Sequence, residues 1–166
     1  MMETFSEKPD TIIKSFGPGT VYTTINYDAK ENPDGTWSAI SVTIETSGSV
    51  TKDDILNALL VDIDSQTDKK ILSGFTWRGK SVWLSAENQR NFSEGQRAAM
   101  ITNGDSLPIT FKIGEDEHKL PIYHEFTTVE DLTEFYLQGV EFINQTLNEG
   151  WRNKDAATKW VDSLEL

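Results

Sequence analysis

The sequence predicts an α+β fold in which short antiparallel β-hairpins pack with helices and the C-terminal helix is long. Three observations predict it. Segments with the period-two alternation of strands occur in pairs around turn sequences. Other segments place apolar residues three and four positions apart, which is the period of a helix. With 166 residues, 37% of them apolar, the chain can build one modest core, with room for a small appended unit.

Residues 1–19 are expected to form a lead-in without regular structure. They carry few periodic apolar positions, and Gly17-Pro18-Gly19 interrupts any strand or helix. A β-hairpin is expected next, because residues 21–27 and 37–44 both show strand alternation. The connection between these two strands ends in Asn-Pro-Asp-Gly, which is strong turn chemistry.

A helix is expected to begin after Thr51. The Thr51 hydroxyl can accept the amide three residues later, where Asp54 is favourable at the positive end of a helix. The apolar residues that follow share one helix face: Ile55, Leu56, Leu59, Leu60 and Ile63. Residues 20–72 therefore form a predicted N-terminal unit of hairpin and helix, and residues 73–166 a second, hairpin-helix-hairpin-helix domain.

Residues 74–92 read GFTWRGKSVWLSAENQRNF, which predicts a tight hairpin leading into a helix. With Arg78-Gly79 as a two-residue turn, Trp77 pairs with Lys80. Alternate residues share a face of a strand, so Trp77 and Trp83 point in opposite directions. The face of Trp77 holds the residues expected to reach the core: Phe75, Trp77, Val82 and Leu84.

The helix that follows is expected to start at Ser85, as its N-cap, and to end at Asn103-Gly104. Ser85 is better explained by this capping role than as a nucleophile. Three residues of the helix are available to pack inward: Phe92, Ala99 and Met100.

A second hairpin is expected between residues 107 and 123. Residues 107–113 alternate, residues 114–118 form the turn, and the chain returns through Leu120, Ile122 and Tyr123. Thr128 is then expected to cap the final helix, whose apolar residues share one face: Leu132, Phe135, Tyr136, Gly139, Val140, Phe142, Ile143 and Leu147.

Two features of the final helix depart from this pattern. Leu137 lies outside the apolar face. Gly150 is expected to kink or end the helix, with residues 151–160 continuing as a further helical segment.

The charge balance excludes two classes of partner. The chain has 27 acidic and 15 basic side chains, so its formal charge of -12 repels phosphate backbones and anionic lipid headgroups. No nucleic acid or membrane partner is therefore expected. Because the sequence shows neither a membrane span nor a secretory leader, we expect a soluble chain made in a cytoplasm.

No cofactor, metal or catalytic residue is predicted, and the chain is not expected to be an enzyme. There is no cysteine, no phosphate-binding glycine loop and no nucleophile motif. His118 and His124 with their acidic neighbours suggest a metal site, but their spacing does not impose convergence, so we interpret them as solvated. The aspartates of residues 62–68 lack the glycine and closing glutamate of a calcium loop.

The five tryptophans are the remaining unusual feature of the sequence. In a chain of this size they are most often core anchors, less often parts of a protein interface and least often platforms for sugars. Four aromatic residues are the candidates for an interface or ligand contact: Trp83, Trp37, Trp151 and Tyr123.

An ordered series of motifs in the second half of the chain carries a resemblance to a known family. The motifs are GKSVWLSAENQ at residues 79–89, LPITFKIG at 107–114, DLTEFY at 131–136 and GWRNKD at 150–155. In this order they resemble the phage-associated family called domain of unknown function 4376, most of all the versions from Bacteroides-type bacteria and their phages or prophages. The resemblance covers about residues 68–161, and its members are typically encoded among tail, baseplate or tail-fibre genes.

The resemblance implies a non-enzymatic virion protein, structural or adaptor in character, in a phage tail, baseplate or tail fibre. Its implied partners are other tail or fibre proteins, or further copies of itself, and its implied location is the virion, with the host cytoplasm during assembly. Residues 20–72 lie outside the resemblance and are a candidate attachment module. The alternatives are a bacterial protein without a phage role, a tail-fibre assembly chaperone, and a carbohydrate-binding module that uses Trp83 or Trp37.

Overall fold

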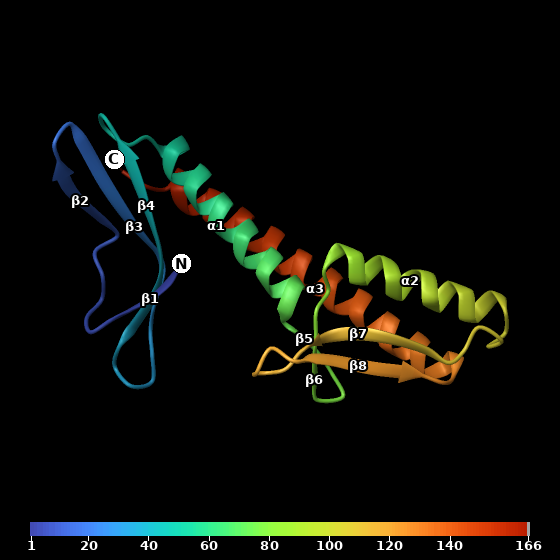
Figure 1. Ribbon diagram of the computed structural model, residues 1–166. Coiled ribbons are helices and arrows are strands. Elements are labelled where there is room, and N and C mark those ends of the chain that lie inside the picture. The colour runs from blue at the N-terminus through green and yellow to red at the C-terminus, as the bar shows by residue number, and fades with distance from the viewer. Residues whose placement is uncertain (166) are drawn as a thin grey trace. The chain divides into compact units, whose positions relative to one another are not determined.

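The computed structural model describes residues 1–165, which divide into two compact units (Figure 1). One unit is Met1–Ser65 together with residues 150–165, and the other is Gln66–Glu149. The described residues form three helices and eight strands in antiparallel sheets, which confirms the predicted α+β class. Helices α1 (Lys52–Ser73) and α3 (Val129–Asp162) contribute residues to both units.

The unit that contains Met1–Ser65 is built on a four-stranded antiparallel sheet in the order β1-β4-β3-β2. Strands β3 (Thr20–Glu31) and β4 (Trp37–Thr46) are the predicted first hairpin. The other two strands, β1 (Met2–Phe5) and β2 (Ile12–Gly17), lie in the segment expected to be an unstructured lead-in. Both are sheet edges, and pairing through backbone hydrogen bonds with one neighbour lets them form without the periodic apolar positions of a half-buried strand.

The core of this unit lies between the sheet and one face of α1 and α3 (Figure 1). Thr51 caps α1 as predicted, because its hydroxyl accepts the Asp54 N–H at 3.2 Å while the Asp54 carboxylate accepts the Thr51 N–H at 2.9 Å. The buried apolar residues come from the sheet, the connection from β4 to α1, α1 itself and the last turns of α3: Ile25, Val50, Ile55, Leu59, Ile63, Ala157 and Val161.

The Gln66–Glu149 unit begins with the predicted tight hairpin. Strands β5 (Phe75–Trp77) and β6 (Lys80–Val82) pair in the expected register, with Trp77 opposite Lys80. Arg78 and Gly79 both have positive φ, 47° and 76°, as a type I′ turn requires. The Arg78 guanidinium lies 4.5 Å from the centre of the Trp77 ring and pairs with two carboxylates of α3, those of Asp131 and Glu134.

Helix α2 (Ala86–Ile101) follows with the predicted N-cap, since the Ser85 hydroxyl accepts the Asn88 N–H at 3.2 Å. Phe92 and Ala99 are buried as expected, but Met100 is 56% exposed. The prediction for Met100 was wrong because the core-facing stripe of α2 runs through Phe92, Gly95 and Ala99, next to which Met100 points outward.

Strands β7 (Ile109–Glu115) and β8 (Pro121–Phe126) form the second predicted hairpin, with a later turn than expected. The Asp116 carboxylate closes the turn by accepting the N–H groups of His118 and Leu120. Gly114, predicted to be in the turn, lies in β7 beside an irregularity in the pairing. A Cβ at Gly114 would lie 2.5 Å from the Ser81 carbonyl oxygen, so glycine is needed for the close approach of β6 to β7.

Helix α3 is capped by Thr128, as predicted, and continues through Gly150 to Asp162 without ending there. Gly150 was expected to kink or end the helix, and of these two the end is wrong, while the predicted helix over 151–160 is confirmed as part of α3. Leu137 is exposed, as expected from its place outside the apolar face. No helix within residues 1–165 combines the length and the apolar character that a membrane crossing needs.

Candidate functional site: a groove beside Trp83

A groove with a volume of about 730 Å³ opens on the Gln66–Glu149 unit beside Trp83. This volume lies in the range of ~300–1,000 Å³ typical of small-molecule sites. Its lining comes from the end of α1, the connection from β6 to α2, the first turns of α2, and β7: Leu72, Ser73, Trp83, Ser85, Glu87, Asn88, Asn91, Phe92, Thr110, Phe111, Lys112 and Gly114.

The backbone of Trp83 is fixed on two sides. Its N–H donates to the Ile113 carbonyl at 2.7 Å, and its own carbonyl accepts the Asn88 side-chain Nδ2–H at 2.9 Å. The first of these bonds depends on the close approach of the two strands at Gly114. The backbone of Trp83 is therefore fixed by a strand contact and by a helix side chain.

The start of α2 is held in the same way. The Gln89 side chain donates from Nε2 to the Leu84 carbonyl at 2.6 Å, in addition to the Ser85 cap described above. These bonds satisfy backbone groups next to the first turn of a helix, where intrahelical partners are missing. The segment from Trp83 to Gln89 is thus braced, and four of its residues line the groove: Trp83, Ser85, Glu87 and Asn88.

The indole of Trp83 is half-buried and lies beside a polar face of the second hairpin. Lys112 Nζ is 5.7 Å from the centre of the Trp83 ring and pairs with the Glu115 carboxylate at 2.8 Å. Lys112 is directly opposite Tyr123 in the hairpin, so their side chains share one face, and Tyr123 is 60% exposed. The structure thus brings Trp83 and Tyr123 to the two sides of Lys112.

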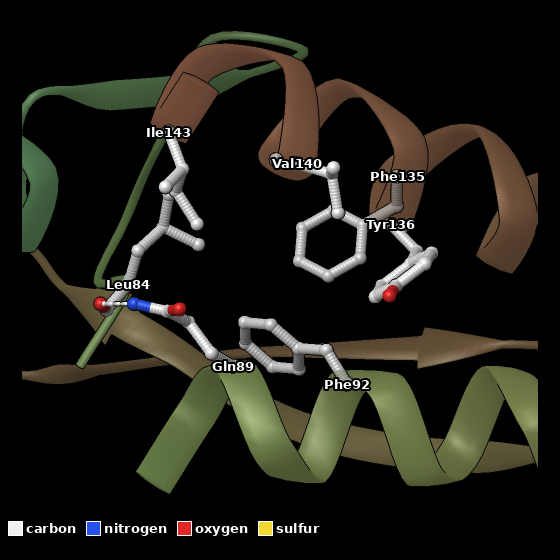
Figure 2. A pocket seen from close by; sticks show the side chains of 8 residues that line it. Leu84, Gln89, Phe92, Phe135, Tyr136, Val140 and Ile143 are labelled. Atoms are coloured by element: carbon white, nitrogen blue, oxygen red, sulfur yellow. Dashed lines mark hydrogen bonds between the residues drawn. The ribbon is translucent and has the colours of Figure 1, made fainter. Parts of the chain in front are cut away.

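A second, smaller cavity lies between α2 and α3 (Figure 2). Its volume is about 120 Å³, and Figure 2 shows the side chains of Leu84, Phe92, Val140 and Ile143 around it. Gln89 lies at the same opening, with its amide bonded to Leu84 as above. Apolar cavities of this size accept one small apolar group, such as a benzene ring or an aliphatic side chain.

The other two aromatic candidates belong to the unit that contains Met1–Ser65. Trp37 is half-buried in β4, with Lys8 Nζ 5.6 Å from the centre of its ring. Trp151 lies in α3 and is 58% exposed. Neither residue lines the groove.

Sequence reasoning selected Trp83 and missed the polar residues around it. Asn88, Asn91, Thr110 and Lys112 come from two elements that are separated along the chain. The one sequence feature that pointed to these polar residues was the amide-rich run after Ser85, which includes Asn88 and Asn91. The start of a helix at Ser85 was a sufficient explanation for that run.

The two histidines have different environments. His118 is exposed in the β7–β8 turn. His124 packs its ring against Trp77 and Phe126, with centroid distances of 4.9 and 4.6 Å. Burial and the positive charge of Lys80, whose Nζ is 3.1 Å from Nδ1, lower the pKa of His124. Within residues 1–165 no group of three or more histidine, aspartate or glutamate side chains is placed to hold a metal ion.

The fold and the groove define a class of protein: a two-unit α+β chain with a groove that combines one indole with amide and hydroxyl side chains. Comparisons with protein-family models, curated proteins and solved structures found no match for the chain.

Proposed function

We propose that this chain is a non-enzymatic adaptor protein of a bacteriophage or prophage tail, baseplate or tail fibre, and that it stays in the virion. The observation that carries the proposal is the division into two compact units, each with its own apolar core. An adaptor must present two surfaces that remain folded while each meets a different partner. Two separate cores supply that property.

Exposed aromatic residues on both units support a role in protein contacts. Tyr123 belongs to the Gln66–Glu149 unit, and Trp151 and the 78% exposed Phe16 belong to the other. Tyrosine and tryptophan are enriched at the energetic centres of interfaces, because they bury much area and keep a polar end. The partners proposed are other tail or fibre proteins, or further copies of this chain.

The resemblance to the phage-associated family supports the same reading. Several of its motif residues lie in the braced segment beside the groove, among them Trp83 and Asn88, which line it. The phage assignment itself comes from the resemblance, and the adaptor role comes from the two-unit geometry.

The test follows the protein through assembly of the phage or induced prophage that encodes it. We expect it in purified particles after washing in high salt, detected by mass spectrometry. A chain in which both Tyr123 and Trp151 are changed to alanine should enter particles less well, because both proposed contact surfaces are weakened. The matched control is Leu120→Ala, which removes an equally exposed apolar side chain from a turn.

One outcome would replace the adaptor role with that of an assembly chaperone. The net charge of -12 suits transient contacts that weaken with salt. A protein that is abundant in the lysate, bound to tail-fibre subunits and missing from finished particles would be such a chaperone. A protein found in neither place would contradict both proposals.

A further inference from the structure

We infer that the groove beside Trp83 is a carbohydrate-binding site and that its ligand is a neutral oligosaccharide. This goes beyond the proposed adaptor role, which concerns protein partners. Four features carry the inference: the indole, the unpartnered polar groups around it, the size of the groove and the charge of the chain.

The indole supplies the surface on which a sugar ring can stack. Pyranose rings present faces of C–H groups, which pack against aromatic rings while their hydroxyl groups stay at the edge. Trp83 lines the groove, and its backbone N–H and carbonyl each make a hydrogen bond, one to the Ile113 carbonyl and one from the Asn88 side chain. Because that backbone is fixed in advance, little conformational entropy is lost when a ligand binds.

The polar groups of the groove offer what sugar hydroxyls require. Asn88 uses its Nδ2–H for Trp83, and among the described residues its Oδ1 has no partner. In the same part of the chain, the side chains of Asn91 and Thr110 make no hydrogen bond. Amide and hydroxyl groups can both donate and accept, as sugar hydroxyls do, so these side chains match a polyhydroxylated ligand.

Size and charge narrow the class of ligand. A groove of about 730 Å³ is larger than one side chain needs and suits several linked sugar rings. The only cation of the lining, Lys112, is already paired with Glu115, and Glu87 adds a carboxylate. With a net charge of -12 on the whole chain, acidic polysaccharides are repelled and neutral ones are favoured.

A polypeptide segment is the competing occupant, and the observations favour it less. Peptides that bind tightly insert apolar anchors into closed pockets. On this unit the smaller cavity between α2 and α3 is almost entirely apolar, whereas the groove places amide, hydroxyl and charged side chains among its apolar residues, at seven of its twelve lining positions.

The experiment uses the purified full chain on an array of bacterial capsular and lipopolysaccharide glycans together with defined neutral oligosaccharides. Isothermal titration then gives Kd for each glycan that binds. We expect binding to neutral glycans, a loss of about tenfold or more in affinity for Trp83→Ala, and a loss of about two- to tenfold for Asn91→Ala, equal to one hydrogen bond.

A groove variant that keeps its stability and a control variant outside the groove make the result specific to the groove. Asn91 is exposed and without a hydrogen-bond partner among the described residues, so Asn91→Ala should melt like the wild type even if Trp83→Ala is destabilised. Trp151→Ala removes an exposed tryptophan from the other unit and should leave Kd unchanged.

The inference is overturned if no glycan on the array binds, or if both groove variants bind as tightly as the wild type. Groove variants that lose a polypeptide partner while no glycan binds would assign the groove to the competing occupant. Failure here is separable from failure of the adaptor role, because particle association and glycan binding are measured independently.

Discussion

Trp77 and Trp83 show how the period of a strand assigns different roles to similar side chains. Trp77 is 1% exposed and its ring meets those of Phe126 and Phe135, with centroid distances of 5.6 and 5.1 Å. Trp83, on the opposite face, is half-buried and lines the groove. The two-residue turn at Arg78-Gly79 fixes the register and therefore this division of roles.

Replacing Trp77 with alanine should lower the free energy of unfolding by about 3–5 kcal/mol, because the cavity left behind lies among packed aromatic rings. Urea unfolding followed by circular dichroism measures this change. Trp151→Ala, at an exposed position, is the control and should change the free energy by about 0.5 kcal/mol or less. An unchanged unfolding midpoint for Trp77→Ala would show that Trp77 is not part of the core.

His124 should make the stability depend on pH in mildly acidic solution. Its pKa in the folded state is lowered from 6.5 by burial and by Lys80, with Arg78 acting in the same direction and Asp131 against it. Between that lowered pKa and pH ~6.5 the unfolded chain binds more protons than the folded one. The free energy of unfolding should therefore fall as pH decreases through this window, and this histidine should add no slope above it.

The measurement is urea unfolding at a series of pH values for the wild type and for His124→Gln. The variant should lose the slope below pH ~6.5. The exposed His118, changed to glutamine, should keep the slope. Equal slopes in the wild type and His124→Gln would show that other groups cause the pH dependence.

At the scale of elements, the sequence predicted those with strong local signals. The hairpin of β5 and β6, the caps at Thr51, Ser85 and Thr128, and the pairing of β3 with β4 all have turn or cap residues at fixed offsets. The edge strand β1 was missed because its partner, β4, lies on a distant segment. Strand β2 pairs with the next strand of the chain across Pro18-Gly19, and it was missed because Gly17-Pro18-Gly19 was interpreted as an interruption rather than as a hairpin turn.

The candidate site could be predicted only in part. Trp83 and Tyr123 were candidates because they are aromatic residues on expected strands, whereas the placement of Trp83 beside Lys112, the residue opposite Tyr123, depends on the contact between β6 and β7. That contact depends on Gly114, which the local pattern placed in a turn. The approach of two strands from different hairpins is tertiary information that local periodicity does not contain.

Changing Gly114 to alanine should separate β6 from β7. The new Cβ would lie 2.5 Å from the Ser81 carbonyl oxygen, a backbone atom that cannot rotate away, so we expect a loss of about 1–3 kcal/mol in the free energy of unfolding. Hydrogen exchange should also show faster exchange of the Trp83 amide, which donates across this contact.

The matched control for this change is Gly139→Ala. Gly139 is in helix α3, and a Cβ there would meet Leu84 and Phe75 at 3.7 and 3.8 Å, which are ordinary contact distances. This variant should be neutral or gain up to about 1 kcal/mol from helix propensity. If Gly114→Ala behaved like Gly139→Ala, the strand approach would not require glycine.

At the scale of the whole molecule, one unit is assembled from two distant parts of the chain. The N-terminal sheet and the first part of α1 share a core with residues 150–165, in which Ala157 and Val161 are buried. The sequence analysis predicted a boundary between residues 72 and 73, with residues 73–166 as one domain. The structure differs from this prediction because the last turns of α3 pack with the N-terminal sheet. The apolar periodicity of a helix predicts which of its faces is buried, but it does not predict which of two cores each turn packs against.

A chain that stops after Glu149 should therefore lose the fold of its N-terminal sheet. The core residues Ile25 and Ile55 would be uncovered, while the Gln66–Glu149 core would keep its residues. Hydrogen exchange should show loss of amide protection in β3 and β4, with protection in β5 and α2 retained as the internal control. Protected β3 amides in the shortened chain would contradict this division of the cores.

The divided unit also sets the order in which the protein can fold on the ribosome. The sheet and the first half of α1 emerge before residues 66–149, but the helix turns that cover their apolar face are synthesised only after those residues. Making those intervening residues takes on the order of ten seconds. During that time the inserted unit can complete its own core, so the second unit to be translated is expected to be the first to finish folding.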